Sequence, residues 1–212
     1  MKIAIIGATG MAGQAIYNEA RERGHEAVAI VRSETRAKEI LGSDAKVMTK
    51  DAFSLEKSDL EGFDVVVNAF ATAPNLAYLH VDLAAKLVAL LRETEAPRLF
   101  FILGAGSLFD ENGNRFVETI RKVPDADAWI SIPENQLKEL LFLQNVENVN
   151  WVGVSPSAEF VPGEKHTPVL GTDHLLVAAD GKSHTTNKTM AAAILNEIEK
   201  PTTIRGRFTV SD

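Results

Sequence analysis

Apolar runs of strand length alternate with amphipathic stretches of helical length along this chain of 212 residues. The apolar runs are mostly unbroken, as in 64–70, which is typical of strands buried on both faces of a sheet. The longest amphipathic stretch, 77–94, carries leucines at a period of 3.6, which indicates a helix packed on a core. The alternation predicts an α/β fold, with a doubly wound parallel sheet and helices on both faces. The predicted strands are 2–6, 26–32, 46–49, 64–70, 98–105, 150–155 and a late edge strand at 207–210, and the predicted helices are 12–24, 33–42, 77–94, 133–145 and 187–200.

Two polar stretches depart from this alternation. The stretch 107–129 follows the fifth predicted strand and contains a turn signal at Asn112–Gly113, so we interpret it as an insertion or lid. The stretch 155–184 is rich in Pro and Gly, and we expect a hairpin that turns at Asp180–Gly181. Both stretches follow the carboxyl ends of predicted strands, where ligands bind in an open parallel sheet.

Length and composition narrow the class of protein. The length suits one domain, which we expect to span 1–212, with 155–188 as a small irregular loop or hairpin segment on the substrate side. Apolar residues make up 45% and charged residues 24%, close to globular averages. A net charge of −7 argues against nucleic acid as a partner, and the lack of cysteine excludes thiolate nucleophiles and Cys-ligated metals.

Nothing in the sequence suggests export or a membrane. Gly7 and Gly10 interrupt the first apolar run before it reaches the length of a signal peptide core. No segment approaches the roughly 20 apolar residues of a membrane span. We therefore expect a cytoplasmic protein that does not bind a membrane.

Three glycines at a spacing of three, Gly7, Gly10 and Gly13, stand between the first predicted strand and the first predicted helix. In such a turn, Gly7 permits the tight bend, Gly10 lets backbone amides approach a pyrophosphate, and Gly13 lets the helix pack closely on the strand. The positive end of the helix dipole then favours phosphate groups. This context predicts a Rossmann-type dinucleotide site more strongly than a purely structural turn.

The end of the second predicted strand bears on the choice of dinucleotide. Folds that select NAD usually offer an acidic residue to the ribose hydroxyls there, whereas this chain has Arg32. A guanidinium group can bind a 2′-phosphate through charge-assisted hydrogen bonds, which favours NADP over NAD. Two alternatives remain, because Glu34 is close enough to serve the ribose and Arg32 could be a solvated charge at a strand end.

The segments GATGMAG, VVVNAF, FFILGAGSL and WVGVSPS together resemble the atypical short-chain dehydrogenase/reductase superfamily. Within it, the chain is most similar to the NAD(P)-binding group that includes the NmrA-like proteins and the biliverdin IXβ/flavin reductase-like enzymes. The resemblance covers almost the whole chain. It implies that the cofactor is bound by Thr9, Met11 and Ala12 at the pyrophosphate, Asp51 and Ala52 at the adenine, Asn68, Ala69 and Phe70 along the ribose and adenine, and Pro156 and Ser157 behind the nicotinamide. For Asn68 and Ser157 the alternative is ordinary loop capping.

Typical members of this superfamily carry a Tyr and, four residues later, a Lys on one helix. The corresponding helix lacks the pair: Ile132 and Gln136 fall near those positions, and Lys138 is about two residues out of register. Ser107 matches the family's active-site hydroxyl and would orient a substrate, unless it only caps its loop. Some relatives without the Tyr and Lys reduce conjugated acceptors by direct hydride transfer.

Other chemistries have less support. His166, His174 and His184 lack metal-ligand spacing, so we expect no metal.

The resemblance implies an oxidoreductase that transfers hydride from NADPH to a small conjugated or carbonyl acceptor, such as a quinone or a flavin. The alternative is a non-catalytic, NADP-sensing regulatory protein of the NmrA-like type. For these two hypotheses together, the expected partner is a small-molecule substrate or none.

Overall fold

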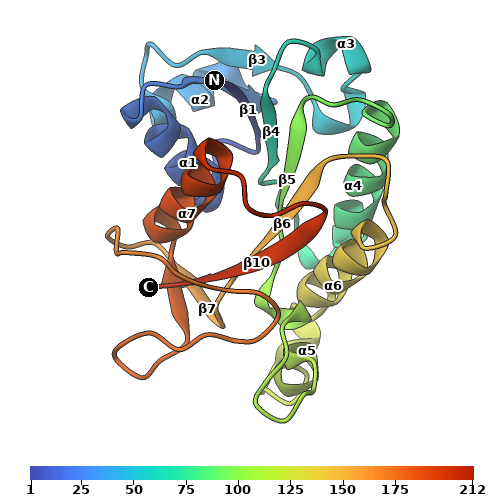
Figure 1. Cartoon of the computed structure of the whole chain (residues 1–212), viewed down its shortest axis with the longest axis vertical. Coiled ribbons are helices and arrows are strands. Elements are labelled where there is room, and N and C mark those ends of the chain that lie inside the picture. The colour runs from blue at the N-terminus through green and yellow to red at the C-terminus, as the bar shows by residue number, and fades with distance from the viewer.

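The computed structural model describes residues 1–212 and has a sheet of eight strands at its centre (Figure 1). The strand order is β3-β2-β1-β4-β5-β6-β10-β8, and neighbouring strands are parallel except for β8, which is antiparallel to β10. A separate parallel pair, β7 and β9, lies outside this sheet. This arrangement confirms the predicted α/β fold, a Rossmann-like and mostly parallel sheet.

The elements follow one another in the predicted alternation. The strands are β1 (Lys2–Ile6), β2 (Glu26–Val31), β3 (Val47–Thr49), β4 (Val65–Asn68), β5 (Arg98–Ile102), β6 (Trp151–Pro156), β7 (Glu159–Val161), β8 (Val169–Gly171), β9 (His184–Thr186) and β10 (Gly206–Ser211). The α-helices are α1 (Met11–Glu22), α2 (Glu34–Leu41), α3 (Lys57–Leu60), α4 (Leu79–Leu90), α5 (Phe116–Ile120), α6 (Ser131–Leu143) and α7 (Asn187–Glu199). None of these helices combines the length and the hydropathy that crossing a membrane requires.

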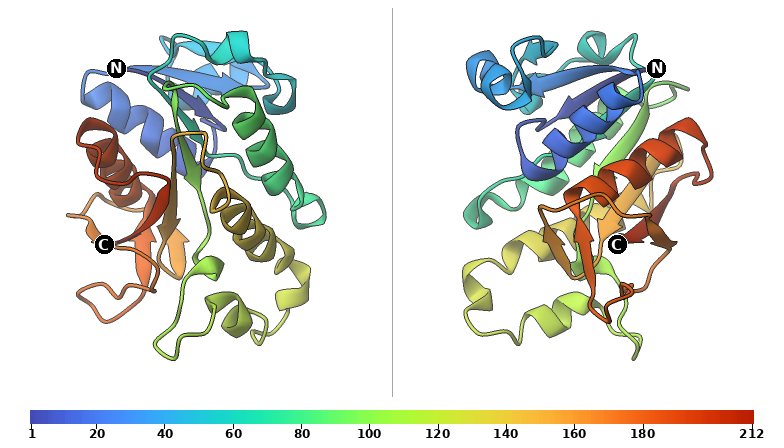
Figure 2. Two further views of the ribbon diagram at one scale, coloured as in Figure 1. Left: turned by 45° about the vertical axis from the view of Figure 1, so that its right-hand side comes forward. Right: turned by 90° about the vertical axis from the view of Figure 1, so that its left-hand side faces the viewer.

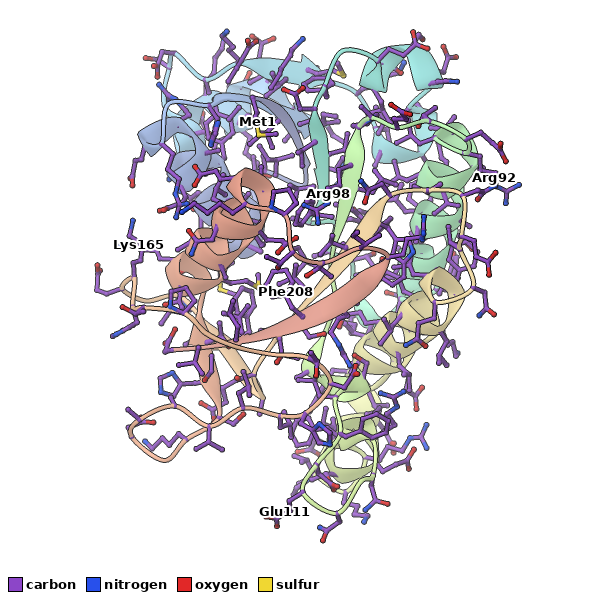
Figure 3. All side chains as sticks on the ribbon, viewed as in Figure 1. Met1, Arg92, Arg98, Glu111, Lys165 and Phe208 are labelled. Carbon is purple, nitrogen blue, oxygen red and sulfur yellow. The ribbon has the colours of Figure 1, made fainter.

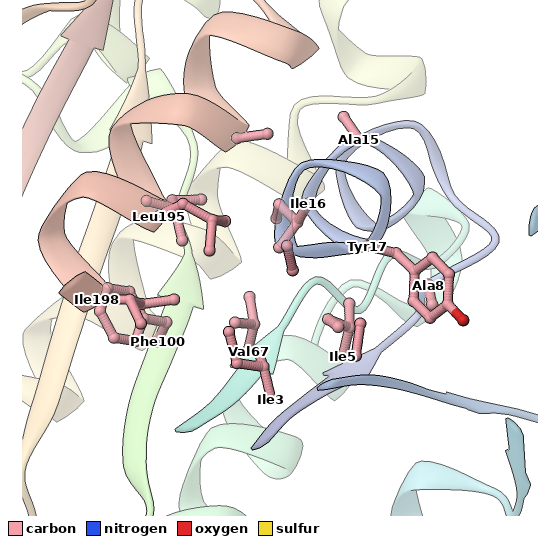
Figure 4. Close-up of a cluster of buried hydrophobic side chains, with 14 of the residues drawn as sticks. Ile3, Ile5, Ala8, Ala15, Ile16, Tyr17, Val67, Phe100, Leu195 and Ile198 are labelled. Carbon is pink, nitrogen blue, oxygen red and sulfur yellow. The ribbon is translucent and has the colours of Figure 1, made fainter. Parts of the chain in front are cut away.

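Helices cover both faces of the sheet (Figure 2). One buried cluster joins Ile3 and Ile5 of β1 to α1 and α7, with Leu195 of α7 among its members (Figure 4). The other cluster joins the alternate residues Ala4 and Ile6 to α4 and α6. Because successive side chains of a strand point to opposite faces, the unbroken apolar run of β1 is buried on both sides, as predicted.

The last strand does not lie where the sequence predicted. β10 is not an edge strand, because it pairs with β6 on one side and with β8 on the other. Phe208 packs in the core on one face of the sheet, while the polar side chains of Arg207 and Thr209 are buried on the other face. The polar face is buried because loops cover it, as Asp173 covers Arg207.

The two irregular segments differ in how closely they follow expectation. Residues 107–129 add no strand to the sheet and contain the short helix α5, in line with an insertion. Within 155–184, the chain does turn at Asp180–Gly181, where the glycine has a φ of 83°. The predicted hairpin is wrong, however, because β9 pairs in parallel with β7 instead of with the chain before the turn.

A buried ion pair joins the start of β5 to the end of α7. Arg98, near the centre of Figure 3, donates to Glu197 Oε1 at 2.6 Å and to the Glu197 carbonyl at 3.0 Å. Burial alone would raise the pKa of Glu197, but hydrogen bonds from Thr202, Thr203 and Arg98 lower it below its ordinary value. The carboxylate is therefore charged and fully engaged, which ties α7 to the sheet.

Candidate cofactor site

The glycine turn between β1 and α1 is shaped by close backbone contacts. Gly7 has a φ of 75°, and a Cβ there would lie 2.5 Å from the carbonyl oxygen of Ala69. A Cβ at Gly13 would lie 2.8 Å from Ala8 Cα, because α1 packs directly on the turn. The fold itself therefore requires glycine at both positions.

Neither the backbone conformation nor the packing requires glycine at position 10. Its φ of −82° suits any residue, and the nearest atom to an added Cβ would be 3.4 Å away. Gly10 is the N-cap of α1, and no side chain caps that helix. The N–H groups of the first turn, at the positive end of the helix dipole, are thus open to a ligand. This open approach fits the pyrophosphate of a dinucleotide.

A cavity of about 690 Å³ opens beside this turn, at the carboxyl ends of β1, β2 and β4. Its volume is typical of small-molecule sites. Eight of the predicted cofactor residues line it: Gly7, Thr9, Gly10, Arg32, Asp51, Ala52, Ala69 and Phe70. The other predicted cofactor residues, Met11, Ala12, Gly13, Asn68, Pro156 and Ser157, are not among the lining residues.

Three basic side chains, Arg32, Arg36 and Lys50, form what we call the cationic wall of the cavity. Lys50 Nζ binds Asp59 at 2.5 Å, whereas neither arginine side chain has an ion pair or hydrogen-bond partner. Sequence reasoning missed Arg36 and Lys50. The signal for Arg36 was its place in the first turn of the helix that follows Arg32, where its N–H donates to the N-cap Ser33.

Glu34, the alternative partner for the ribose hydroxyls, does not line the cavity. Its carboxylate forms an ion pair with Lys38 at 2.6 Å, one turn further along α2. The structure therefore brings Arg32, and not Glu34, to the wall of the cavity.

Residues at the ends of β3 and β4 complete the surroundings of the cavity. Asp51 Oδ1 accepts a hydrogen bond from the N–H of Phe53 at 2.8 Å. This contact fixes one carboxylate oxygen and leaves the other oxygen free for a ligand. Asn68 is buried and accepts from the N–H of Phe70 at 3.2 Å, so its side chain stabilises the turn after β4. Phe70 packs edge-on against Phe53 and lines the cavity as an apolar surface.

The two predicted serines use their hydroxyl groups within the protein. Ser107 is fully buried, and its hydroxyl donates to the Gly104 carbonyl at 3.1 Å and accepts from Arg207 at 2.9 Å. Ser157 is also buried, and its hydroxyl donates to the Val210 carbonyl at 3.0 Å. The contact of Ser107 with Gly104 is a local one, as in the loop-capping alternative, whereas Ser157 bonds to the distant strand β10.

The helix α6 presents an amide where typical relatives have an ammonium group. A Cβ at Gly104, just after β5, would lie 3.0 Å from Cδ of Gln136 and closer still to its Oε1. Gln136 therefore lies directly against the carboxyl end of β5, while Lys138 is exposed. The site has a neutral hydrogen-bonding group at this point and no ionisable one.

A buried pair of ionisable groups lies between α4 and α6. Nδ1 of His80 is 3.8 Å from Oε2 of Glu139, and both side chains are almost completely inaccessible. Burial raises the pKa of Glu139 well above its ordinary value and lowers the pKa of His80. Burial therefore favours the neutral form of both groups. His80 also packs edge-on against Phe70 of the cavity wall.

The remaining histidines do not form a metal site. No group of three or more metal-ligating side chains is arranged to hold an ion. His184 lies between Asp180 and Asp212, at 3.1 and 3.0 Å. Partial burial works against protonation of His184, but the two carboxylates outweigh it and raise its pKa.

Known proteins resemble this chain over its whole length. A sequence model of NAD(P)H-binding proteins matches residues 7–201. The uncharacterised protein YwnB of Bacillus subtilis is 38% identical over 213 residues, which cover 99% of this chain and 98% of YwnB.

Solved structures agree with this likeness. A crystal structure from Lactobacillus casei is 42% identical, with a TM-score of 0.92, and the match covers 100% of this chain and 99% of the other. A Streptococcus pneumoniae protein, described provisionally as an NADH-flavin reductase, is 35% identical with a TM-score of 0.89 and the same coverage. These likenesses confirm the expected resemblance to NAD(P)-binding proteins of the atypical short-chain dehydrogenase/reductase type. Together with the glycine turn and the cavity beside it, they show that the chain belongs to the NAD(P)H-binding family, whose cofactor is a nicotinamide dinucleotide.

Proposed function

We propose that the protein is an NADP-preferring oxidoreductase that reduces a small conjugated or carbonyl acceptor, such as a quinone or a flavin. The bound dinucleotide supplies the hydride. The provisional description of the Streptococcus pneumoniae relative as an NADH-flavin reductase supports the reaction class, although that description names the other dinucleotide. The observation that carries the NADP preference is the cationic wall.

The charge balance at this wall favours a phosphate ligand. Arg32 and Arg36 have no carboxylate partner, and Glu34 is held by Lys38. A 2′-phosphate would give both guanidinium groups charge-assisted hydrogen bonds. The adenosine ribose of NAD has only hydroxyl groups to offer at this point, so neither guanidinium group gains a charged partner from it.

The residues of α6 favour acceptors that need no phenolic proton donor. Ile132 and Gln136 stand near the positions of the usual Tyr and Lys, so these two positions offer one amide for hydrogen bonding and no acid. Quinones and flavins suit such a site, because their reduced forms can take a proton from solvent. Positioning of the acceptor is then the main contribution of the protein.

The cofactor preference is tested by titrating NADPH and NADH into Arg32→Ala and Arg36→Ala. Loss of one charge-assisted hydrogen bond weakens binding about tenfold or more, and we expect this for NADPH alone. Arg92→Ala is the matched control, because Arg92 is an exposed arginine that follows α4 and does not line the cavity (Figure 3). Equal losses for NADPH and NADH would refute the preference.

A second candidate is a protein that senses NADP without turnover. The missing Tyr and Lys and the occupied hydroxyl of Ser107 favour it. The purified protein should be mixed with NADPH and a panel of quinones, flavins and aromatic aldehydes, while absorbance at the nicotinamide band is followed. Turnover supports the oxidoreductase, whereas tight binding without turnover of any acceptor supports the sensor.

A further inference from the structure

The two irregular segments of the chain meet beyond the carboxyl end of β5. The N–H of Phe109 donates to the carbonyl of Asp173 at 2.8 Å, and the N–H of Leu175 donates to the carbonyl of Phe109 at 2.9 Å. The rings of Phe109 and His174 also pack together, with centroids 5.8 Å apart. These loops lie at the lower end of the molecule, where Glu111 marks a tip (Figure 3).

A buried arginine lies beneath this junction. The side chain of Arg207 on β10 is only 2% exposed. It donates to the hydroxyls of Ser107 at 2.9 Å and Ser155 at 3.2 Å, and forms an ion pair with Asp173. Its Nε has no partner. Burial lowers the pKa of Arg207, Asp173 opposes this effect, and the nearby charge of Arg115 adds to it.

Arg115 is a second guanidinium group at the same place. It donates to the carbonyl of Ser107 and lies 3.9 Å over the ring of Phe109, but it forms no ion pair. Ser107 is therefore held by one arginine at its hydroxyl and by another at its carbonyl. Asp173 is the one carboxylate paired with these two cations, and its side chain is 51% exposed on a loop.

We propose that Arg115 and Arg207 bind the anionic group, a carboxylate or a sulfonate, of the hydride acceptor, and that Asp173 occupies this place when no acceptor is bound. The inference rests on the proposed function and names its substrate class. An incoming anion takes the place of the Asp173 carboxylate, so the buried charge of Arg207 is never left unpaired. The position beside Ser107, after β5, is on the sheet edge where α/β folds bind ligands.

The exposed position of Asp173 makes the exchange feasible. Its carboxylate reaches Arg207 from a loop whose neighbours Thr172 and His174 are also exposed. Displacement of the Asp173 side chain alone would free the Arg207 guanidinium group for another anion, and the backbone hydrogen bonds of the loop to Phe109 need not break. Arg115, which is only half-buried, is already accessible in part, so an acceptor anion can meet it before it displaces Asp173.

Isothermal titration calorimetry on the full chain loaded with NADP tests this inference. The probes are 1-naphthoate and its neutral counterpart 1-naphthamide, which have nearly the same shape. We expect naphthoate to bind at least about tenfold more tightly, which corresponds to one charge-assisted interaction. Asp173→Asn should tighten naphthoate severalfold, and Arg115→Gln should weaken it about tenfold, with naphthamide unchanged in both.

Arg121→Gln, at an exposed arginine just after α5, is the control and should change neither affinity. Equal affinities for the two probes would overturn the inference. So would an Asp173→Asn protein that melts at a lower temperature with unaltered affinity for naphthoate, because Asp173 would then be purely structural. The test is independent of turnover: charge-dependent probe binding without oxidation of NADPH by any acceptor would count against the proposed reaction and not against the anion site.

Discussion

Glu139→Gln is the most informative single change for the stability of this fold. Glu139 is buried between α4 and α6, and the one ionisable group near its carboxyl is His80, at 3.8 Å. Burial holds the pKa of Glu139 well above its ordinary value of 4.5. Glutamine has nearly the same shape and cannot ionise, so the substitution removes the titration and little else.

The sign of the effect follows from proton linkage. Above pH 4.5 the unfolded chain releases the Glu139 proton while the folded protein keeps it, so the wild type loses stability as pH rises toward the folded pKa. The loss approaches about 1.4 kcal/mol per pH unit. The glutamine variant does not lose stability in this way, because its side chain cannot ionise. We therefore expect the free energy of unfolding of the variant, relative to that of the wild type, to increase with rising pH. The increase should level off above the pKa of Glu139 in the folded protein.

Urea unfolding followed by tryptophan fluorescence gives the free energies, because Trp151 is 1% exposed in the fold. The difference between variant and wild type should be measured between about pH 5 and pH 8, because the titration of His80 in the unfolded chain is common to both proteins and cancels. Glu147→Gln, at an exposed glutamate after α6, is the matched control and should show no trend. A difference for Glu139→Gln that stays flat over this range would refute the reasoning.

Two other perturbations separate binding from folding. Gly10→Ala should leave the melting temperature nearly unchanged but weaken NADPH binding at least about tenfold, because its methyl group meets no protein atom closer than 3.4 Å yet blocks the amides of α1. Gly13→Ala should instead lower the melting temperature, because its methyl group would overlap Ala8 Cα at 2.8 Å; similar melting curves for the two variants would contradict this distinction. Arg98→Met should reduce the free energy of unfolding by about 3 kcal/mol in urea titrations, since it leaves the Glu197 charge buried without its ion pair, and a loss below about 1 kcal/mol would show that the threonine donors suffice.

The sequence predicted those elements of the fold that depend only on residues close together in the chain. The run 2–6 is apolar at nearly every position and forms β1, and the glycine spacing placed the turn before α1 correctly. The place of β10 could not be read in this way. It depends on pairing with β6 and β8, and its polar residues, such as Arg207, are buried only because distant loops cover them.

The cofactor site likewise contains residues that the sequence predicted and residues that it did not. Arg32 was identifiable from its place after β2, and the structure brings it to the cavity. Lys50 reaches the same wall from the end of β3, a meeting that depends on strand order and not on spacing in the sequence. Ser107 was expected to face a substrate, yet its hydroxyl meets Arg207, which lies 100 positions further along the chain.

The ion pair between Arg98 and Glu197 also bears on the order of events during synthesis. The two residues are 99 positions apart, so Arg98 has left the ribosome long before its partner exists. Until α7 and β10 are made, β6 has one open edge and the start of β5 carries an unneutralised cation. Contacts of such long range slow folding, because the chain must close large loops before they form. The nascent chain up to β6 therefore lacks its next strand and the partner of Arg98 until translation is almost complete, and such an unpaired edge is the kind of surface on which a nascent chain aggregates.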